Sequence, residues 1–131
     1  MSHEIHLTIH KSWLLTSNAR GHWAKRSGTI RNLRTLGRAE AVRQLQGLRL
    51  DRAHIEVWFT FPDYRRRDVG NLSPTAKALV DGLVDAGLLP DDDWRHLVGP
   101  DLRINGAGKS RPDHVGIRVV IHPLDDAVEA P

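Results

Sequence analysis

The chain has 131 residues, with 19 Lys and Arg against 16 Asp and Glu, which gives a formal net charge of +3. This length predicts one domain around one core, and the absence of cysteine excludes disulfides and thiolate metal sites. No apolar stretch is long enough to span a bilayer and the N-terminus MSHEIH lacks a signal-peptide pattern, so we expect a cytoplasmic protein without membrane contact.

The positive charge is unevenly distributed along the chain. Residues 1–50 hold nine Lys and Arg against two acids, Glu4 and Glu40, and 15 of the 19 basic residues of the chain are Arg. Guanidinium groups form bidentate contacts with phosphate, although codon usage in a GC-rich genome would give the same excess of Arg. A basic half is typical of a nucleic-acid-binding protein, and a solvated basic face is the alternative interpretation.

The first half of the chain alternates between strand and helix patterns. Residues 4–10 (EIHLTIH) alternate apolar and polar side chains and predict a half-buried strand, followed by a loop over 11–23. Residues 25–46 have a helical period, with Gly47 as a stop, and residues 53–61 (AHIEVWFTF) predict a second strand. The apolar stripe of this helix consists of Ile30, Leu33, Gly37, Ala41, Leu45 and Leu48, and a neighbouring basic ridge consists of Arg31, Arg34 and Arg38.

The second half predicts one more helix and two more strands. The helix covers 73–85, with Ser73 as its N-cap, and the strands cover 96–104 and 114–122. We expect the core stripe of the helix to face the sheet and a second set of its residues to face solvent. The core set is Ala76, Leu79, Val80, Leu83, Val84 and Leu88, and the solvent set is Ala78, Gly82 and Asp85.

The element order β-α-β-α-β-β predicts an α+β fold, in which helices cover one mixed sheet. We expect residues 1–122 to form a single domain. Residues 123–131 carry Asp125, Asp126 and Glu129, and we expect them to form a disordered acidic tail.

The segment GAGKS (106–110) has the look of a phosphate-binding loop but fails its two requirements. A glycine is needed where Arg103 stands, and a helix must follow the Ser, whereas a strand pattern follows here. We therefore expect no nucleotide cofactor, and we interpret the segment as a basic hairpin that carries Lys109 and Arg111.

The eight histidines do not predict a metal site from their spacing. His6 and His10 share a strand face, but at roughly 3.3 Å per residue they lie about 13 Å apart, which is too far for one ion. His96, beside an acidic triplet, is the one histidine that we keep as a site candidate.

The acidic candidates are Asp68, at the end of the basic run RRRDVGN (65–71), and the triplet DDD (91–93). The arginines of the run either neutralise a structural aspartate or lie beside an aspartate that binds a metal. The triplet is either a polar turn or a source of oxygen ligands, which Mg²⁺ prefers. Lys77 lies at the flank of the apolar stripe, so its ammonium extends to solvent, pairs with Asp81, or points into a site.

Three segments in this order resemble the RusA family of Holliday-junction resolvases, endonucleases common in phages and prophages. They are SNARGHWAKR (17–26), RRRDVGN (65–71) and KALVDGLVDAGLLPDD (77–92). The resemblance covers about residues 14–122, with 65–92 its most specific part. It implies a small α+β homodimer in a bacterial or phage-infected cell, which binds four-way (Holliday) DNA junctions and resolves them by paired symmetric nicks with Mg²⁺ or Mn²⁺.

The resemblance also implies the roles of individual residues. Asp68, Asp91 and Asp92 correspond to metal-binding catalytic carboxylates, with Asp92 preferred over Asp91 as the ligand, and Lys77 to a lysine that steadies the scissile phosphate or the transition-state charge. The chemistry agrees, because carboxylates hold hard cations and a cation stabilises the charge that develops on phosphoryl oxygens.

The chain departs from the family pattern at Gly70. The family has D-x-D-N in this turn, whereas this chain has D-V-G-N, so one expected catalytic carboxylate is missing. The sequence leaves three explanations open: inactivation by engineering, natural decay into a junction-binding protein, or compensation by Asp63 or Asp93. We therefore expect impaired cleavage, with a non-catalytic protein that binds branched DNA as the alternative function.

The expected phosphate contacts are polar and basic residues of the first two segments, of the basic ridge and of the basic hairpin, and binding through them should weaken steeply with salt. They are Asn18, Arg20, Lys25, Arg26, Arg31, Arg34, Arg38, Arg65, Arg66, Arg67, Asn71, Lys109 and Arg111. A third hypothesis is a single-strand binder that stacks bases on Trp13, Trp23, Trp58 and Trp94, but these tryptophans are scattered along the chain.

Overall fold

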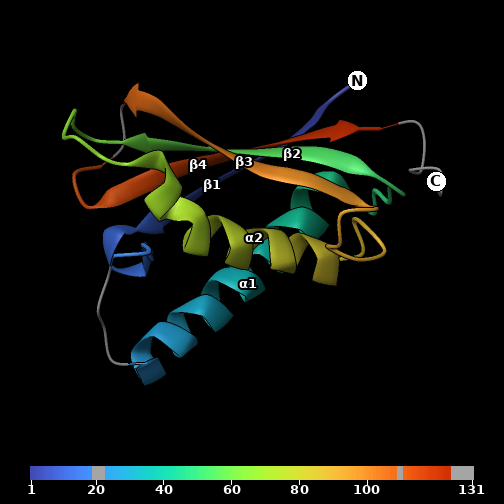
Figure 1. The fold of residues 1–131 in the computed structure, drawn as a ribbon, viewed down its shortest axis with the longest axis horizontal. Helices are drawn as coiled ribbons and strands as arrows, with labels where there is room; N and C mark the ends of the chain where they lie inside the picture. The colour runs from blue at the N-terminus through green and yellow to red at the C-terminus, as the bar shows by residue number, and fades with distance from the viewer. Residues whose placement is uncertain (19–22, 109–110, 125–131) are drawn as a thin grey trace.

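The computed structural model describes residues 1–18, 23–108 and 111–124, which form one four-stranded sheet with two helices on one of its faces (Figure 1). The α+β class and the predicted element order are confirmed. In chain order the elements are β1 (His3–His10), the 3₁₀ turn η1 (Lys11–Trp13), α1 (Trp23–Leu45), β2 (Ala53–Phe61), the 3₁₀ turn η2 (Val69–Leu72), α2 (Ser73–Asp85), β3 (Leu97–Ala107) and β4 (His114–Pro123).

The sheet is mixed, as predicted. Its strand order is β1-β4-β2-β3, with β2 parallel to β3, and β4 antiparallel to both β1 and β2. In β2, Ile55, Val57 and Phe59 are fully buried, whereas the side chains between them are half-buried. Because side chains alternate along a strand, one face of the sheet forms the core under α1 and α2. The opposite face carries no helix within the described ranges (Figure 1).

The two helices cross at a pair of glycines. A Cβ atom on Gly37 would lie 2.5 Å from the carbonyl oxygen of Leu79, and one on Gly82 would lie 2.2 Å from the carbonyl oxygen of Arg34. Only glycine permits this approach, since any other residue would place its side chain inside the backbone of the facing helix. The crossing fixes how α2 lies against α1, and therefore where the polar side of α2 points.

The prediction of which residues of α2 face solvent was wrong at two positions. Ala78 and Gly82 were expected on the solvent face, but both are buried. Their side of the helix faces α1, and small residues there allow the two backbones to come close. Asp85, the third residue of the predicted solvent set, is exposed as predicted.

The ends of several elements also differ from the predictions, and β3 continues to Ala107 instead of ending at residue 104. Ser73 does not cap α2, because the 3₁₀ turn η2 continues directly into the helix and Leu72 occupies the N-cap position without a side-chain hydrogen bond. Strand β4 ends at Pro123, one residue beyond the predicted domain boundary, and the amide of Leu124 donates to the carbonyl of Arg52 at 3.0 Å. The remainder of the predicted tail, 125–131, lies outside the described residues.

Thr75 ties the loop after η1 to the start of α2. Its hydroxyl donates to the carbonyl oxygen of Leu15 and accepts from the amide of the same residue, both at 2.8 Å, and the side chain is fully buried. The amide of Ser17 donates to the carbonyl of Asn71 at 3.0 Å. These bonds hold residues 14–17 beside the turn that contains Asp68.

We find no helix among the described residues with both the length and the apolar character that crossing a membrane would require.

Candidate functional site

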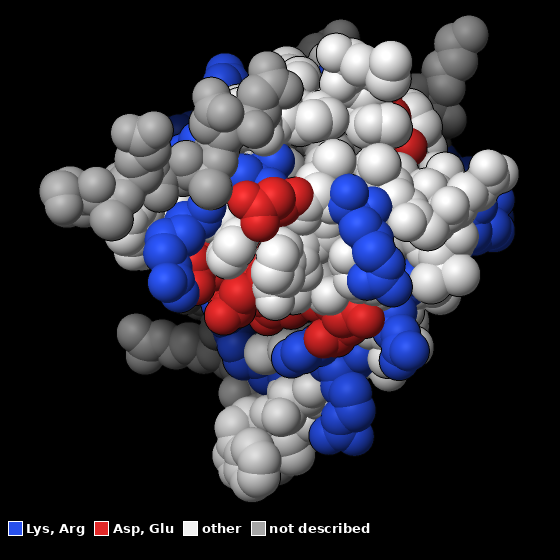
Figure 2. All heavy atoms as spheres, turned by 90° about the vertical axis from the view of Figure 1, so that its right-hand side faces the viewer, with Lys and Arg blue, Asp and Glu red and all other residues white. Residues whose placement is uncertain are grey.

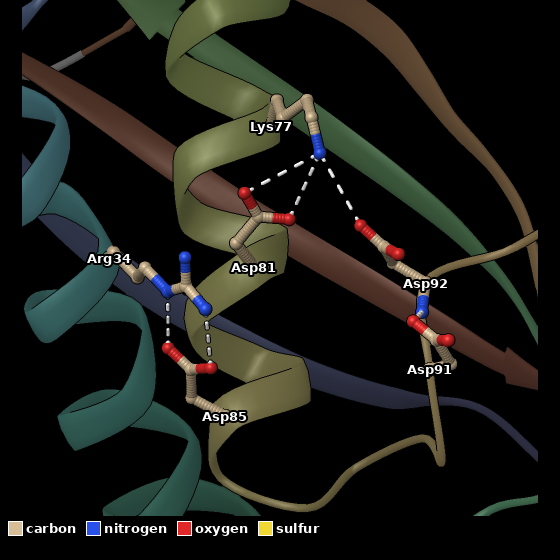
Figure 3. Close-up of polar contacts among 6 residues, drawn as sticks. All are labelled: Arg34, Lys77, Asp81, Asp85, Asp91 and Asp92. Carbon is tan, nitrogen blue, oxygen red and sulfur yellow. Dashed lines mark hydrogen bonds and ion pairs between the residues drawn. The ribbon is translucent and has the colours of Figure 1, made fainter.

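Lys77 lies between two carboxylates that come from different parts of the chain (Figure 3). Its Nζ donates to Oδ1 of Asp81 at 3.1 Å, one turn along α2, and to Oδ2 of Asp92 at 3.4 Å. Asp92 reaches this position because the segment after α2 turns back: Leu88 and Leu89 are buried against the core, and the amide of Leu50 donates to the carbonyl of Leu88. The fold therefore brings the 91–93 triplet to α2.

Lys77 and Asp92 each stabilise the charged form of the other. The hydrogen bond to Asp81, with a further contribution from Asp92, raises the pKa of Lys77 above its ordinary value of 10.5, so the ammonium is charged at neutral pH. Contacts with the Asp91 side chain and with Lys77 hold the pKa of Asp92 below its ordinary value of 3.8. The Asp92 carboxylate is therefore available as an ionised oxygen donor.

The contacts of Lys77 combine two of the three alternatives that the sequence left open. The ammonium pairs with Asp81, and it also reaches a residue of the candidate site, Asp92. The side chain is 68% exposed, so the cluster is open to solvent and to a large ligand. Both carboxylates offer oxygen donors, the ligand type that a hard divalent ion prefers.

Asp85 and Arg34 form a second ion pair on the same side of α2 (Figure 3). Nη2 of Arg34, from α1, donates to Oδ1 of Asp85 at 2.8 Å, and Nε donates to the other oxygen. The pair lowers the pKa of Asp85 and raises that of Arg34. Arg34, an expected phosphate contact, is thus engaged within the protein. Figure 2 shows acidic side chains gathered at one end of the molecule, with Lys and Arg side chains around them.

Asp68 is one of the residues that line an open cleft of about 440 Å³. It immediately precedes η2, it is exposed, and its backbone carbonyl accepts from the amide of Asn71. Within the described ranges, no hydrogen bond or ion pair joins the Asp68 side chain to Asp91 or Asp92. The cleft is lined by Leu14, Thr16, Phe61, Arg66, Arg67, Asp68, Asn71 and Leu72.

The arginines of the basic run differ in their contacts: Arg67 is paired within the protein, whereas Arg66 is exposed. Arg67 donates from Nη2 to Oδ1 of Asp63 at 2.9 Å, and its guanidinium lies 3.8 Å from the centre of the Phe61 ring. The backbone amide of Arg65, together with Arg67, holds the pKa of Asp63 below its ordinary value. The structural aspartate that the run neutralises is therefore Asp63, and this pairing argues against Asp63 as the compensating ligand. Arg66 is exposed at the cleft.

Gly70 is not required by the backbone or by packing. A Cβ atom added to it has no neighbour within 4 Å, and its φ is outside the left-handed region that favours glycine. A side chain could therefore begin at this position without a clash at its Cβ atom. Simple turn chemistry therefore does not explain the glycine.

The other expected DNA-binding residues lie mostly on the surface. Arg26 is half-buried and donates to the carbonyl of Thr16 at 3.3 Å, and Arg111 contacts His114. Arg20 and Lys109 lie outside the described residues. The exposed members are Asn18, Lys25, Arg31, Arg38, Arg65, Arg66 and Arg111.

The GAGKS segment is followed by a strand, as predicted, but its first two residues belong to β3 and not to the predicted loop. Gly106 and Ala107 end strand β3, and the next element is strand β4 rather than a helix. The segment therefore lacks the helix N-terminus that a phosphate-binding loop needs.

The histidine prediction missed one group. His54, Glu56 and His122 lie on the sheet face that no described helix covers, with one donor atom of each within 4.8 Å of the others. Chain spacing gave no sign of this group, because His54 and His122 meet only through the pairing of β2 with β4. His96, the histidine kept as a candidate, instead has its Nδ1 2.7 Å from the carbonyl oxygen of Asp51.

No protein-family model matches this chain, and no curated protein matches it.

Proposed function

We propose that this chain is a RusA-like, metal-dependent endonuclease that binds four-way DNA junctions as a homodimer in the cytoplasm, and that Gly70 impairs its cleavage. The observation that carries the proposal is the contact of Lys77 with Asp92. A lysine of the second helix and an acid of the following loop are the pair that the resemblance assigned to the active site, and they are in contact here.

The proposed metal is a hard divalent cation, because the donors of this cluster are carboxylate oxygens. Asp81 and Asp92 already share one cation, the Lys77 ammonium, and their oxygen donors on an open surface suit Mg²⁺ or Mn²⁺, which retain several waters. Asp92 would hold the ion, with Asp91 beside it, and the resemblance adds Asp68 as a third carboxylate. Bound there, the ion would supply an activated water and charge stabilisation at the phosphodiester.

Lys77 would act on the phosphate rather than on the ion. Its side chain is exposed and flexible, so the ammonium can leave the carboxylates once another cation neutralises them. It would then stabilise the negative charge that develops on the phosphoryl oxygens as water adds to phosphorus and the bond to the leaving sugar oxygen breaks.

DNA binding would depend on the exposed cations of α1 and of the basic run, namely Lys25, Arg31, Arg38 and Arg66. Each phosphate contact of this kind releases counterions, so affinity for a junction should fall steeply as salt rises. Arg34 and Arg67 should contribute less, because both guanidinium groups are paired with aspartates of the chain.

The decisive experiment restores the missing carboxylate. Purified protein, a Gly70→Asp variant and a Gly70→Asn variant are incubated with a synthetic four-way junction in Mg²⁺ and in Mn²⁺. We expect Gly70→Asp to cleave far faster than the chain as given, and Gly70→Asn, which has the same shape without the charge, to stay slow. Equal cleavage by all three would contradict a role for position 70 in metal binding.

Lys77 is tested in the Gly70→Asp background. Lys77→Ala should abolish cutting and leave junction binding on a native gel nearly intact, whereas Lys11→Ala, which removes an exposed lysine from η1, should change neither. Loss of the folded state by Lys77→Ala, seen by circular dichroism, would instead assign the lysine a structural role.

The absence of a carboxylate at position 70 also favours a second candidate, a protein that binds branched DNA without cutting it. It predicts that the chain and its Gly70→Asp variant both shift a junction on a native gel and that neither cleaves it. Failure of both proteins to bind a junction in preference to linear duplex would contradict both candidates.

A further inference from the structure

The open face of the sheet brings two histidines and a glutamate together. His54 of β2 lies directly opposite His122 of β4, and their rings stack with centroids 5.4 Å apart and an interplanar angle of 22°. Glu56 lies on the same face of β2, two residues from His54, since side chains alternate along a strand. Nε2 of His122 lies 2.6 Å from Oε1 of Glu56.

We propose that His54, Glu56 and His122 form a binding site for a transition-metal ion of the zinc type. One donor atom of each residue lies within 4.8 Å of the other two. In a tetrahedral zinc site with bonds of about 2.0–2.1 Å, neighbouring donor atoms lie about 3.3 Å apart. Side-chain rotations that move each donor by about 1 Å, on strands that the sheet holds in register, would bring the three donors to that spacing.

The donor set distinguishes this site from the acidic cluster at Lys77. Two imidazole nitrogens and one carboxylate oxygen suit Zn²⁺ and its neighbours in the transition series, whereas Mg²⁺ prefers an all-oxygen set. The two sites also lie on different elements, since this one is built from β2 and β4 and the other from α2 and the loop that follows it. The proposal therefore does not depend on the proposed nuclease activity.

Two neighbouring residues orient the donors. The carboxylate of Asp101, on β3, contacts Nε2 of His54, and Nε1 of Trp58 donates to Oε2 of Glu56 at 3.1 Å. Outer partners of this kind fix the orientation of metal-binding imidazoles and carboxylates and raise the basicity of the imidazoles. They leave Oε1, the oxygen nearest His122, as the carboxylate donor.

The site is accessible to an ion from solvent. The side chains of His54 and His122 are 29% and 39% exposed, and that of Glu56 is 16% exposed. Three protein donors on an open face leave a coordination position for water or for an external ligand, as zinc sites that take part in chemistry do. The competing explanation is that no metal binds here. The two histidines would then only contact carboxylates of neighbouring strands, His54 that of Asp101 and His122 that of Glu56.

The test is a titration of the purified, metal-free protein with Zn²⁺ by calorimetry and with Co²⁺ by visible absorption, in excess Mg²⁺. We expect one saturable site per chain, a visible Co²⁺ spectrum stronger than that of the hydrated ion, and a rise in melting temperature with Zn²⁺. His122→Asn and Glu56→Gln should each weaken binding by more than about 100-fold, and Asp101→Asn by about 10-fold, as for an outer partner.

The matched control is His10→Asn. His10 belongs to another exposed group in which two histidine rings, 5.3 Å apart, meet one carboxylate, that of Asp113. Its replacement should leave Zn²⁺ affinity unchanged. Absence of a one-to-one site, or equal losses from His10→Asn and His122→Asn, would overturn the proposal. Circular dichroism of each variant confirms that a lost site is not a lost fold.

Discussion

The helix crossing makes a sharp prediction about stability, because alanine should have opposite effects at two glycines of the same helix pair. In Gly82→Ala, the new Cβ would lie 2.2 Å from the carbonyl oxygen of Arg34 and 2.7 Å from the amide nitrogen of Arg38. Both neighbours are backbone atoms, so no side-chain rotation relieves the contact, and the helices must move apart by about 1 Å to reach ordinary contact distance.

The magnitude follows from two opposing contributions. Alanine gains about 1 kcal/mol over glycine in a helix interior, whereas overpacking a core costs about 1–3 kcal/mol, and more where the backbone has to shift. We therefore expect Gly82→Ala to lower the free energy of unfolding by about 2 kcal/mol. A Cβ added to Gly28, in α1, would have no neighbour within 4 Å, so Gly28→Ala should raise the free energy of unfolding by about 0.5–1 kcal/mol.

Urea unfolding followed by far-ultraviolet circular dichroism measures both variants. For a chain of this length, about 2 kcal/mol corresponds to a fall in melting temperature of roughly 6–10 °C. Gly37→Ala, whose Cβ would lie 2.5 Å from the carbonyl of Leu79, should fall in the same direction. A neutral or stabilising Gly82→Ala beside a stabilising Gly28→Ala would refute the close crossing.

Two further predictions concern hydrogen bonds and acid stability. Thr75→Val should lower the free energy of unfolding by about 2–5 kcal/mol, because it leaves the buried amide and carbonyl of Leu15 without partners. Thr75→Ser keeps the hydroxyl and should lose much less. Equal losses from both variants in urea unfolding would contradict this prediction. The pKa of Asp85 in the folded protein lies below its ordinary 3.8, so its contribution to stability is complete well above that pH and is lost as pH falls through and below it. Asp85→Asn should therefore lower the free energy of unfolding at neutral pH and reduce its dependence on pH below about 4. An unchanged pH dependence in that range would show that the contact with Arg34 does not stabilise the fold.

The sequence predicted the elements well because apolar periodicity carries most of that information. The alternation in AHIEVWFTF predicted β2 with its bounds, and the helix predicted over 73–85 has those bounds in α2. The error at Ala78 and Gly82 has a physical reason. Hydrophobic periodicity locates a helix face through its large apolar side chains, whereas a close helix crossing is made by the smallest residues, which carry little apolar signal.

The candidate site was predictable in part, through local sequence rather than through geometry. The segment KALVDGLVDAGLLPDD predicted that Lys77 and Asp92 belong to one site, and the two side chains are in contact. Asp81 also contacts Lys77, but the sequence suggested it only as a helical partner of the lysine. The histidine–glutamate group could not be predicted in this way. It depends on which strands are neighbours and on their register, and neither is fixed by the spacing of histidines along the chain.

The basic run shows how a structure changes the meaning of a charge pattern. Three arginines beside Asp68 suggested either neutralisation of an aspartate or an aspartate that binds a metal, and the structure shows that two of these arginines differ in their contacts. Arg67 is held by Asp63 and stacks on Phe61, which fixes the turn, whereas Arg66 is exposed at the cleft that Asp68 borders and is open to a phosphate. A Cβ atom at position 70 would have no neighbour within 4 Å. The turn therefore accepts a Cβ atom at position 70, and Gly70→Asp is the substitution that would restore the D-x-D-N pattern.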